Sequence, residues 1–239
     1  MQALFLIEAT KFNVLPLDSS FADRMDPATR PNLLRGQTDF TYYPGMIRIP
    51  EANSPSVHNK SFRITADVEI PEGGADGVLA TQGGRFGGWS LLVLDGKPMF
   101  AYAYTNQDGV RYPKQNADKT RIVGAEKLTP GKHTIDFDFK YDGGGLGKGG
   151  LGTLAVDGAK VAESRIERTS PVGKFSLDES FDVGQDTGTP VIDDYEAKMP
   201  FKFSGTLNKL VMRLGEDKLT PEQHGELERL SREFELAVQ

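Results

Sequence analysis

The sequence predicts an all-β sandwich, and two hairpins with Asp-Gly turns are the main reason. Asp95-Gly96 and Asp157-Gly158 each stand between two apolar runs, and such a dipeptide favours a type I′ turn because both central positions need positive φ. Apolar and polar residues also alternate from 134 to 141, which is typical of a strand with one buried face. A chain of 239 residues can bury one large sandwich core, which we place at residues 36–215.

The first hairpin also predicts a register. Counting outward from its turn pairs Val93 with Pro98, Leu91 with Phe100 and Trp89 with Tyr102. The bulky side chains then share one face, while small ones such as Ser90 and Ala101 share the other. We therefore expect a core that contains Trp89, Leu91, Val93, Phe100, Tyr102, Ile135, Phe137 and Phe139.

Residues 1–35 are predicted to form a short helix followed by an extended connector. From 2 to 12, Ala3, Leu4 and Ile7 recur at helical spacing and indicate an amphipathic helix that needs a partner surface. From 13 to 36, prolines interleaved with aspartates favour an extended chain.

Further strands follow from runs of alternating or apolar residues. We predict them at 39–43, 46–49, 61–70, 78–80, 180–184 and 201–214, and we place an edge strand near 121–123 within a long polar loop. In the second hairpin Leu154 should face Val161. The segment 216–239 opens on Thr220-Pro221-Glu222-Gln223, a capping box that predicts a C-terminal helix.

Composition excludes several classes of function. The net charge of -6, without a long basic run, argues against nucleic acid and against an anionic membrane surface. The absence of cysteine removes disulfides, thiolate metal sites and cysteine nucleophiles, and it favours a cytoplasmic location. The first residues do not predict a signal peptide, and no apolar run approaches the roughly 20 residues of a membrane span.

Two motif matches have simpler structural explanations. The G-x-G-x-x-G at Gly145, Gly147 and Gly150 lies between two strands, whereas a dinucleotide site needs a strand and then a helix, so we predict a hairpin loop. Asp136 and Asp138 share one strand face, as glycosidase carboxylates could, but the solvent side of an alternating strand is the simpler interpretation.

The histidines and the single sequon do not predict a site. His58, His133 and His224 stand far apart, so neither a zinc site nor a triad is predicted, and we expect ordinary surface residues. Asn59-Lys60-Ser61 matches an N-glycosylation signal, which matters only in a secretory pathway.

Acidic residues between 182 and 194 form the candidate cation site. Asp182, Asp186, Asp193 and Asp194 lie in one turn-rich stretch, and calcium takes carboxylate and carbonyl oxygens from such loops. The alternative is a turn in which aspartates bond their own backbone. No catalytic residue is predicted in this chain.

Arg85 and Phe86 are the candidate interface or substrate-rim residues. Gly83-Gly84 and Gly87-Gly88 bracket them, so the backbone there can approach another surface closely. Arginine can bind a carboxylate or a sulfate with two donors, and phenylalanine can supply an apolar anchor. The alternative is a glycine-rich β-bulge with Arg85 solvated.

Four longer motifs carry a family resemblance: Phe40-Thr41-Tyr42-Tyr43-Pro44-Gly45-Met46, Gly83-Gly84-Arg85-Phe86-Gly87-Gly88-Trp89, Tyr141-Asp142-Gly143-Gly144-Gly145, and residues 181–190, FDVGQDTGTP. Together they resemble the C-terminal region of large bacterial arylsulfatases of the type I sulfatase family. The resemblance covers most of the chain. It implies a concanavalin-like jelly-roll β-sandwich, with short flanking helices at both termini, packed against a sulfatase catalytic domain.

The resemblance also implies which parts belong outside this chain. Family members use a formylglycine and a calcium ion in the catalytic domain. Ser20-Phe21-Ala22-Asp23-Arg24 fits the serine form of the formylglycine motif but lacks the Thr-Gly that should follow it. We therefore expect an accessory domain of a sulfuric ester hydrolase, with no cofactor of its own unless calcium binds the aspartates named above.

Its expected partner is the sulfatase catalytic domain, either covalently linked or separate, and a homo-oligomer is left open. The alternative function is a carbohydrate-binding or glycoside-hydrolase-like concanavalin-type module. In that case exposed aromatic residues such as Phe86 and Tyr112 would stack on sugar.

Overall fold

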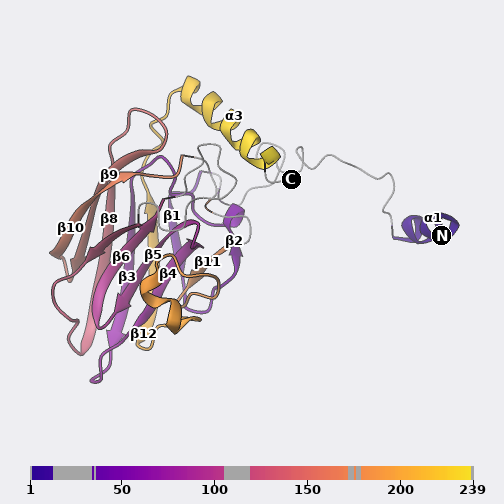
Figure 1. Cartoon of the computed structure of the whole chain (residues 1–239). Helices are drawn as coiled ribbons and strands as arrows, with labels where there is room; N and C mark the ends of the chain where they lie inside the picture. The colour runs from indigo at the N-terminus through magenta and orange to yellow at the C-terminus, as the bar shows by residue number, and fades with distance from the viewer. Residues whose placement is uncertain are drawn as a thin grey trace. The chain divides into compact units, whose positions relative to one another are not determined.

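The computed structural model describes residues 2–12, 34, 36–104, 119–171, 175 and 179–237, apart from the side chains of residues 52, 232 and 234–237. The chain divides into two compact units, residues 1–35 and 36–239, and each is described by itself (Figure 1). The described secondary structure of the first unit is one helix, α1 (Gln2–Lys11).

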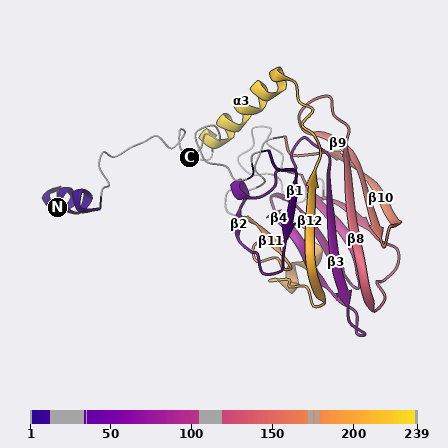
Figure 2. The ribbon, with the colours of Figure 1, turned by 180° about the vertical axis from the view of Figure 1, so that it is seen from behind.

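The second unit is a sandwich of two six-stranded antiparallel sheets, which confirms the predicted all-β jelly-roll class. Sheet A, seen in Figure 2, has the spatial order β1 (Asp39–Tyr42), β12 (Thr206–Leu214), β3 (Phe62–Ile70), β8 (Gly131–Tyr141), β9 (Lys148–Val156) and β10 (Ala159–Arg168). Sheet B has the order β2 (Ile49–Pro50), β11 (Ser180–Val183), β4 (Gly77–Gly84), β5 (Gly87–Leu94), β6 (Lys97–Ala103) and β7 (Lys119–Val123). Two 3-10 helices, η1 (Glu51–Asn53) and η2 (Asp193–Lys198), and the helix α3 (Pro221–Ala237) complete this unit.

Aromatic side chains join the two sheets. Phe100 of β6 stacks on Phe137 of β8 with ring centroids 3.4 Å apart, and Trp89 of β5 lies between Phe100 and Phe181. All eight predicted core residues are buried. Aromatic pairs of this kind add to the free energy gained from burying their area.

The first hairpin has the predicted register. Val93 lies opposite Pro98, Leu91 opposite Phe100 and Trp89 opposite Tyr102, and Asp95 and Gly96 have the φ values of +52° and +78° that a type I′ turn needs. In the second hairpin the prediction was wrong by one residue, because a bulge at Val161 places Ala162 opposite Leu154.

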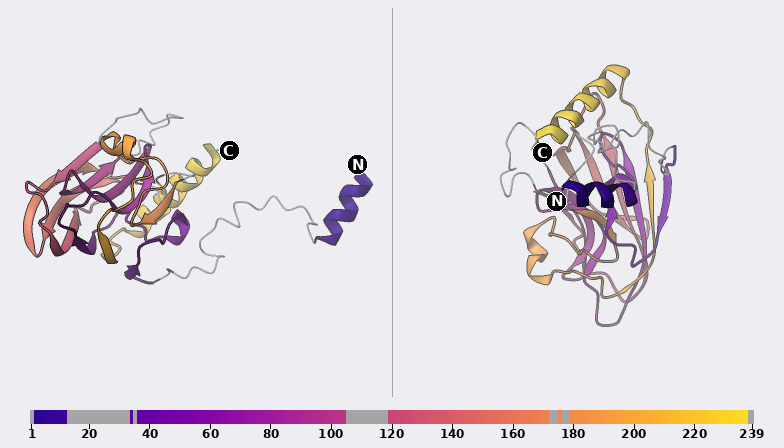
Figure 3. Two further views of the ribbon diagram at one scale, coloured as in Figure 1. Left: turned by 90° about the horizontal axis from the view of Figure 1, so that it is seen from below. Right: turned by 90° about the vertical axis from the view of Figure 1, so that its right-hand side faces the viewer.

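The central strands of sheet B, β4, β5 and β6, are buried on both faces, which the sequence pattern did not predict. Ser90 and Ala101, on the face away from sheet A, have no exposed surface, because residues 185–203 pack over that face. We call residues 185–203 the covering segment (orange in Figure 3). It supplies Val191, Ile192, Tyr195 and Phe201 to an apolar cluster with β4, β5 and β6.

Two predicted strands are shorter than expected, and the covering segment explains the first of these differences. The predicted strand at 201–214 begins only at Thr206, because Phe201 and Phe203 pair with Asp186 and Gly184. The predicted strand at 46–49 is reduced to Ile49–Pro50.

The C-terminal helix begins where the capping box predicts. The amide of Thr220 donates to the side chain of Gln223, and the amide of Gln223 donates back to the Thr220 hydroxyl, at 3.0 and 3.3 Å. Leu227 and Leu230 of its predicted apolar stripe are half-buried, and the Phe234 side chain lies outside the described residues. Among the described helices, none has the length and apolar content needed to cross a membrane.

Candidate functional site

The predicted interface residues lie at the tip of the β4–β5 turn. Gly83 pairs with Gly88 and Gly84 with Gly87, so Arg85 and Phe86 are the two residues of a tight turn. We call Gly84–Gly87 the arch. Gly83 has a φ of +78°, and a Cβ there would lie under 3.0 Å from Gly87 and Gly88 backbone atoms. The glycine at this position is therefore required by both conformation and space.

The covering segment fixes the arch. The Arg85 amide donates to the Thr189 hydroxyl at 3.0 Å, and the Arg85 guanidinium forms an ion pair with Glu196 of η2. Thr189 in turn donates from its hydroxyl to the Glu179 carboxylate at 2.6 Å. The Arg85 side chain is 29% exposed, so it is not a freely solvated arginine. Phe86, which is 45% exposed, is the residue that the arch presents to solvent.

Two of the candidate calcium ligands, Asp182 in β11 and Asp186 in the covering segment, accept hydrogen bonds from backbone amides and hydroxyls. The Asp182 carboxylate accepts from the Arg48 amide at 2.5 Å and from the amide and hydroxyl of Thr187 at 2.9 and 2.6 Å. Asp186 accepts from the Gly188 amide at 3.1 Å and from the Tyr195 hydroxyl at 2.9 Å. This is the hydrogen-bonding pattern of an aspartate-rich turn.

The other two candidate ligands face basic residues of β7. Asp193 pairs with Lys119 at 3.0 Å, and Asp194 accepts two bonds from the Arg121 guanidinium at 2.9 and 2.5 Å. Hydrogen bonding to Arg121 lowers the pKa of Asp194. Within the described part of the chain, no three acidic or histidine side chains converge as a metal ion would require.

Asp186 is the most perturbed acid of this region. Its side chain is buried, and burial raises its pKa to about 6, while the bonds from Tyr195 and Gly188 oppose the shift and the carboxylates of Asp182 and Glu179 add to it. A carboxyl group with a raised pKa favours its neutral form in the fold.

Replacing Asp186 with asparagine should flatten the dependence of stability on pH. With a folded pKa of about 6 above the ordinary value, the wild-type carboxyl contributes fully below about pH 4 and loses that contribution as pH rises through 6. By pH 8 the loss should be on the order of 3 kcal/mol. Urea unfolding at pH 4.5 and pH 8 should detect about 2 kcal/mol of this loss, and parallel pH profiles for the two proteins would contradict the prediction.

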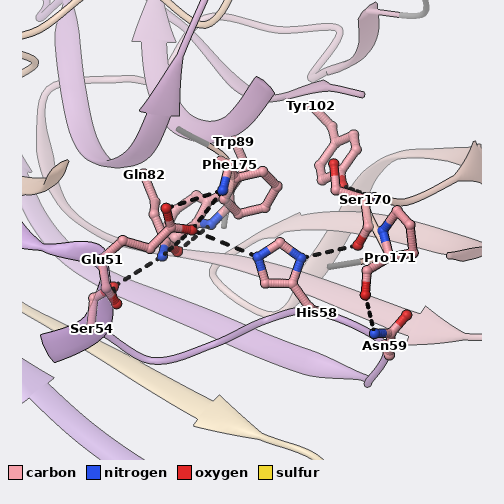
Figure 4. Close-up of polar contacts among 10 residues, drawn as sticks. All are labelled: Glu51, Ser54, His58, Asn59, Gln82, Trp89, Tyr102, Ser170, Pro171 and Phe175. Atoms are coloured by element: carbon pink, nitrogen blue, oxygen red, sulfur yellow. Dashed lines mark hydrogen bonds and ion pairs between the residues drawn. The ribbon is translucent and has the colours of Figure 1, made fainter. Parts of the chain in front are cut away.

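A buried polar network that the sequence did not predict lies beside the arch (Figure 4). Both oxygens of Glu51 accept from the Phe175 amide, at 2.9 and 3.0 Å. His58 Nε2 lies 3.7 Å from a Glu51 oxygen, and its Nδ1 lies 3.0 Å from the Ser170 carbonyl. The His58 ring packs on Phe175. This network therefore fixes segments that are more than 110 residues apart in the sequence.

Gln82 connects the Glu51 network to the core of the sandwich. Its amide nitrogen donates to the Ser54 hydroxyl at 3.0 Å, and its amide oxygen accepts from the indole of Trp89 at 3.0 Å. The Ser170 amide donates to the hydroxyl of Tyr102 at 2.8 Å. Each of these groups is buried, and burial without such partners would cost free energy. The geometry is that of a structural network.

The expectation that His58 is a surface residue was wrong, because it is buried. The Asn59 side chain is also buried and bonds to Pro171 and Gly147, so the folded chain does not offer the sequon to a glycosylating enzyme. Asp136 accepts from Thr65 and Asp138 pairs with Arg63, which confirms them as polar neighbours on the sheet surface.

His133 bonds to Asp157 at 2.7 Å, next to the second hairpin turn. The glycine-rich stretch after Tyr141 connects β8 to β9 as a hairpin loop. Tyr112 and Ser20-Phe21-Ala22-Asp23-Arg24 lie outside the described residues.

No protein-family model matches the chain, and no curated protein matches it. Among solved structures, the CBM40 of the Ruminococcus gnavus IT-sialidase matches with 14% identity and a TM-score of 0.41, over 80% of this chain and 97% of that one. Domains LG4-5 of the mouse laminin alpha1 chain match with 10% identity and a TM-score of 0.41, over 75% and 39%. The binding domain of botulinum neurotoxin serotype G matches with 11% identity and a TM-score of 0.37, over 83% and 40%. These values are too low to bear on function.

Proposed function

We propose that this chain is the C-terminal accessory sandwich of an arylsulfatase-like sulfuric ester hydrolase, and that it packs on a catalytic domain outside residues 1–239. The observation that carries the proposal is the arch. It is built where two of the resembling motifs, 83–89 and 181–190, meet through the bond from Arg85 to Thr189. A fixed turn that exposes one phenylalanine is suited to contact a second surface.

The surroundings of the arch support a positioning role. The described acids near it bond to backbone amides, hydroxyls or basic side chains, and His58 bonds to the Ser170 carbonyl. The covering segment packs on β4, β5 and β6. In the proposal, the formylglycine and the calcium ion that hydrolyse the sulfate ester belong to the catalytic domain. This chain contributes an apolar contact through Phe86 and a turn held in place by Arg85, Thr189 and Glu196.

Association with a sulfatase catalytic domain tests the proposal. The partner is the catalytic domain of an arylsulfatase whose own C-terminal region carries the four motifs, produced without that region. Calorimetric titration should detect binding, and Phe86→Ala should weaken it about 10-fold to 100-fold, the effect of losing one buried aromatic contact. The matched control is Val123→Ala on β7, another exposed apolar residue, which should leave binding unchanged.

Two results would contradict the proposal. One is the absence of binding by the wild-type chain. The other is turnover of a chromogenic aryl sulfate by the isolated chain above the buffer rate, because that would place the catalytic machinery within these residues.

Carbohydrate binding is the second candidate, and the exposed rings of Tyr43 and Phe86 favour it. Aromatic rings at the surface of a sandwich can stack on the apolar face of a sugar. A glycan array distinguishes the two functions. Reproducible binding of a glycan that Phe86→Ala abolishes would support a sugar site at the arch. If the wild-type chain binds no glycan on the array, the accessory role is favoured.

A further inference from the structure

Three basic side chains meet the covering segment at the end of sheet B where the arch lies: Arg85, Lys119 and Arg121. Lys119 stands opposite Ala103, which stands opposite Gly88, the residue directly after the arch. Arg121 lies two positions further along β7 on the same face, about 7 Å from Lys119 by the rise of a strand. We call these three residues the basic cluster.

Each cation of the basic cluster pairs with a different carboxylate of η2. The pairs are Lys119 with Asp193, Arg121 with Asp194, and Arg85 with Glu196. Hydrogen bonding to Arg121 is the main cause of the lowered pKa of Asp194, and the charge of Lys119 lowers it further, so two of the cations act on one carboxylate. Residues 193–196 thus supply three anions to one group of cations.

Tyr195 holds η2 on sheet B independently of these three acids. Its side chain has no exposed surface, its ring stacks on Phe201 with centroids 5.4 Å apart, and its hydroxyl donates to Asp186 at 2.9 Å. The three acidic side chains, by contrast, are 32% to 54% exposed, and ion pairs at such exposure add little to stability. The carboxylates can therefore turn towards solvent while the backbone of η2 stays in place.

The arrangement of charge differs from that on the outer face of sheet A. There, acids and bases share the same strands: Arg63 and Asp67 both lie on β3, and they pair with Asp138 of β8 and Lys209 of β12. In the basic cluster the cations come from the sheet and the arch, whereas their paired carboxylates come from the covering segment. Rotation of the η2 carboxylates alone would therefore leave three cations close together.

We propose that the basic cluster binds a sulfated polymer, and that the η2 carboxylates occupy this site until the polymer displaces them. A guanidinium group can bind a sulfate with two donors, as it binds a carboxylate, so a sulfate can take the place of Asp194 or Glu196. Three cations match a polymer with several sulfates better than a single sulfate ester. The choice of sulfate rests on the proposed function, because the polymer would be anchored here while the catalytic domain hydrolyses one of its esters.

Calorimetric titration of the full chain with dextran sulfate tests the inference, with uncharged dextran as the blank. The acid-to-amide variant, Asp193→Asn with Asp194→Asn and Glu196→Gln, should bind at least about 10-fold more tightly than wild type, because the competing carboxylates are gone. Arg85→Gln with Arg121→Gln should bind at least about 10-fold less tightly than wild type, because two charged donors are lost. Added salt should weaken binding in every variant that binds.

The matched control neutralises three paired acids of sheet A, with Asp39→Asn, Asp67→Asn and Asp138→Asn. It changes the net charge by the same amount and should bind within about threefold of wild type. Equal tightening by the two triple variants would overturn the inference, because net charge alone would explain it. The melting temperature of the acid-to-amide variant should stay within about 5 °C of wild type. Loss of cooperative unfolding would overturn the inference, because the η2 acids would then be structural.

The outcomes separate this inference from the proposed function, because dextran sulfate is titrated into the chain alone. Absence of binding by the acid-to-amide variant would overturn the inference and leave the accessory function in place. Binding of dextran sulfate as expected, without association with the catalytic domain, would overturn the accessory function and leave the anion site. Polyglutamate and single-stranded DNA test other polyanions. Tighter binding of either one than of dextran sulfate would overturn the assignment to a sulfated polymer.

Discussion

Replacing Gly83 with alanine is expected to destabilise the sandwich by about 3 kcal/mol or more, because close packing and backbone strain act at the same residue. The φ of +78° is unfavourable for alanine, and the new Cβ would lie under 3.0 Å from Gly87, Gly88 and Phe175. Two of these neighbours are backbone atoms of the paired strand, so relief requires the β4–β5 pair to separate. Urea denaturation followed by far-ultraviolet circular dichroism measures the loss.

Gly143 provides the matched control for this experiment. Its φ of +76° is almost the same, but a Cβ there would meet no atom within 4 Å. Gly143→Ala should therefore show only the cost of the left-handed conformation, about 1 to 2 kcal/mol. Equal losses in the two variants would show that conformation alone, and not the close approach at the arch, makes Gly83 necessary.

Replacing Trp89 with alanine should cost about 3 to 5 kcal/mol, the usual range for removing a large buried aromatic side chain. Trp89 has no exposed surface, it packs against Phe100 and Phe181, and its indole donates to Gln82. Trp89→Phe keeps a ring in place but leaves the Gln82 oxygen without its donor, so it should cost about 1 to 3 kcal/mol beyond the change in packing.

The control for the Trp89 variants is Phe86→Ala, which removes an aromatic residue three positions away that is exposed. Its effect on stability should stay within about 0.5 kcal/mol. Chemical unfolding followed by circular dichroism compares the variants. A loss at Phe86 as large as that at Trp89 would mean that the arch belongs to the core instead of presenting a contact.

The parts of the sandwich that could be predicted are those whose conformation depends on residues close together in the sequence. A turn such as Asp95-Gly96 fixes its own φ values, and the period of two then assigns every side chain of the hairpin to a face. The bulge at Val161 has no comparable local signal, so the partner of Leu154 was predicted one residue away. The burial of Ser90 depends on the covering segment, about 100 residues later, and no periodicity within β5 could have shown it.

In the candidate site, too, the features set by neighbouring residues could be predicted, and the contacts between distant residues could not. The glycines on both sides of Arg85 and Phe86 mark the arch in the sequence, but Glu196, which pairs with Arg85, does not stand out there. Glu51 and His58 were missed because neither lies in a motif and their partners come from residues 170–175. A buried network of this kind becomes visible only when the chain has been folded.

The burial of Trp89 has a practical consequence, because it is the only tryptophan of the chain. Its indole lies between the two sheets without exposed surface, so its fluorescence should have a short-wavelength maximum that moves to longer wavelength only when the sheets separate. Changes confined to α1 or α3 should leave this emission unchanged. A single fluorometer trace can therefore follow the integrity of the sandwich while a dye attached elsewhere on the chain follows complex formation.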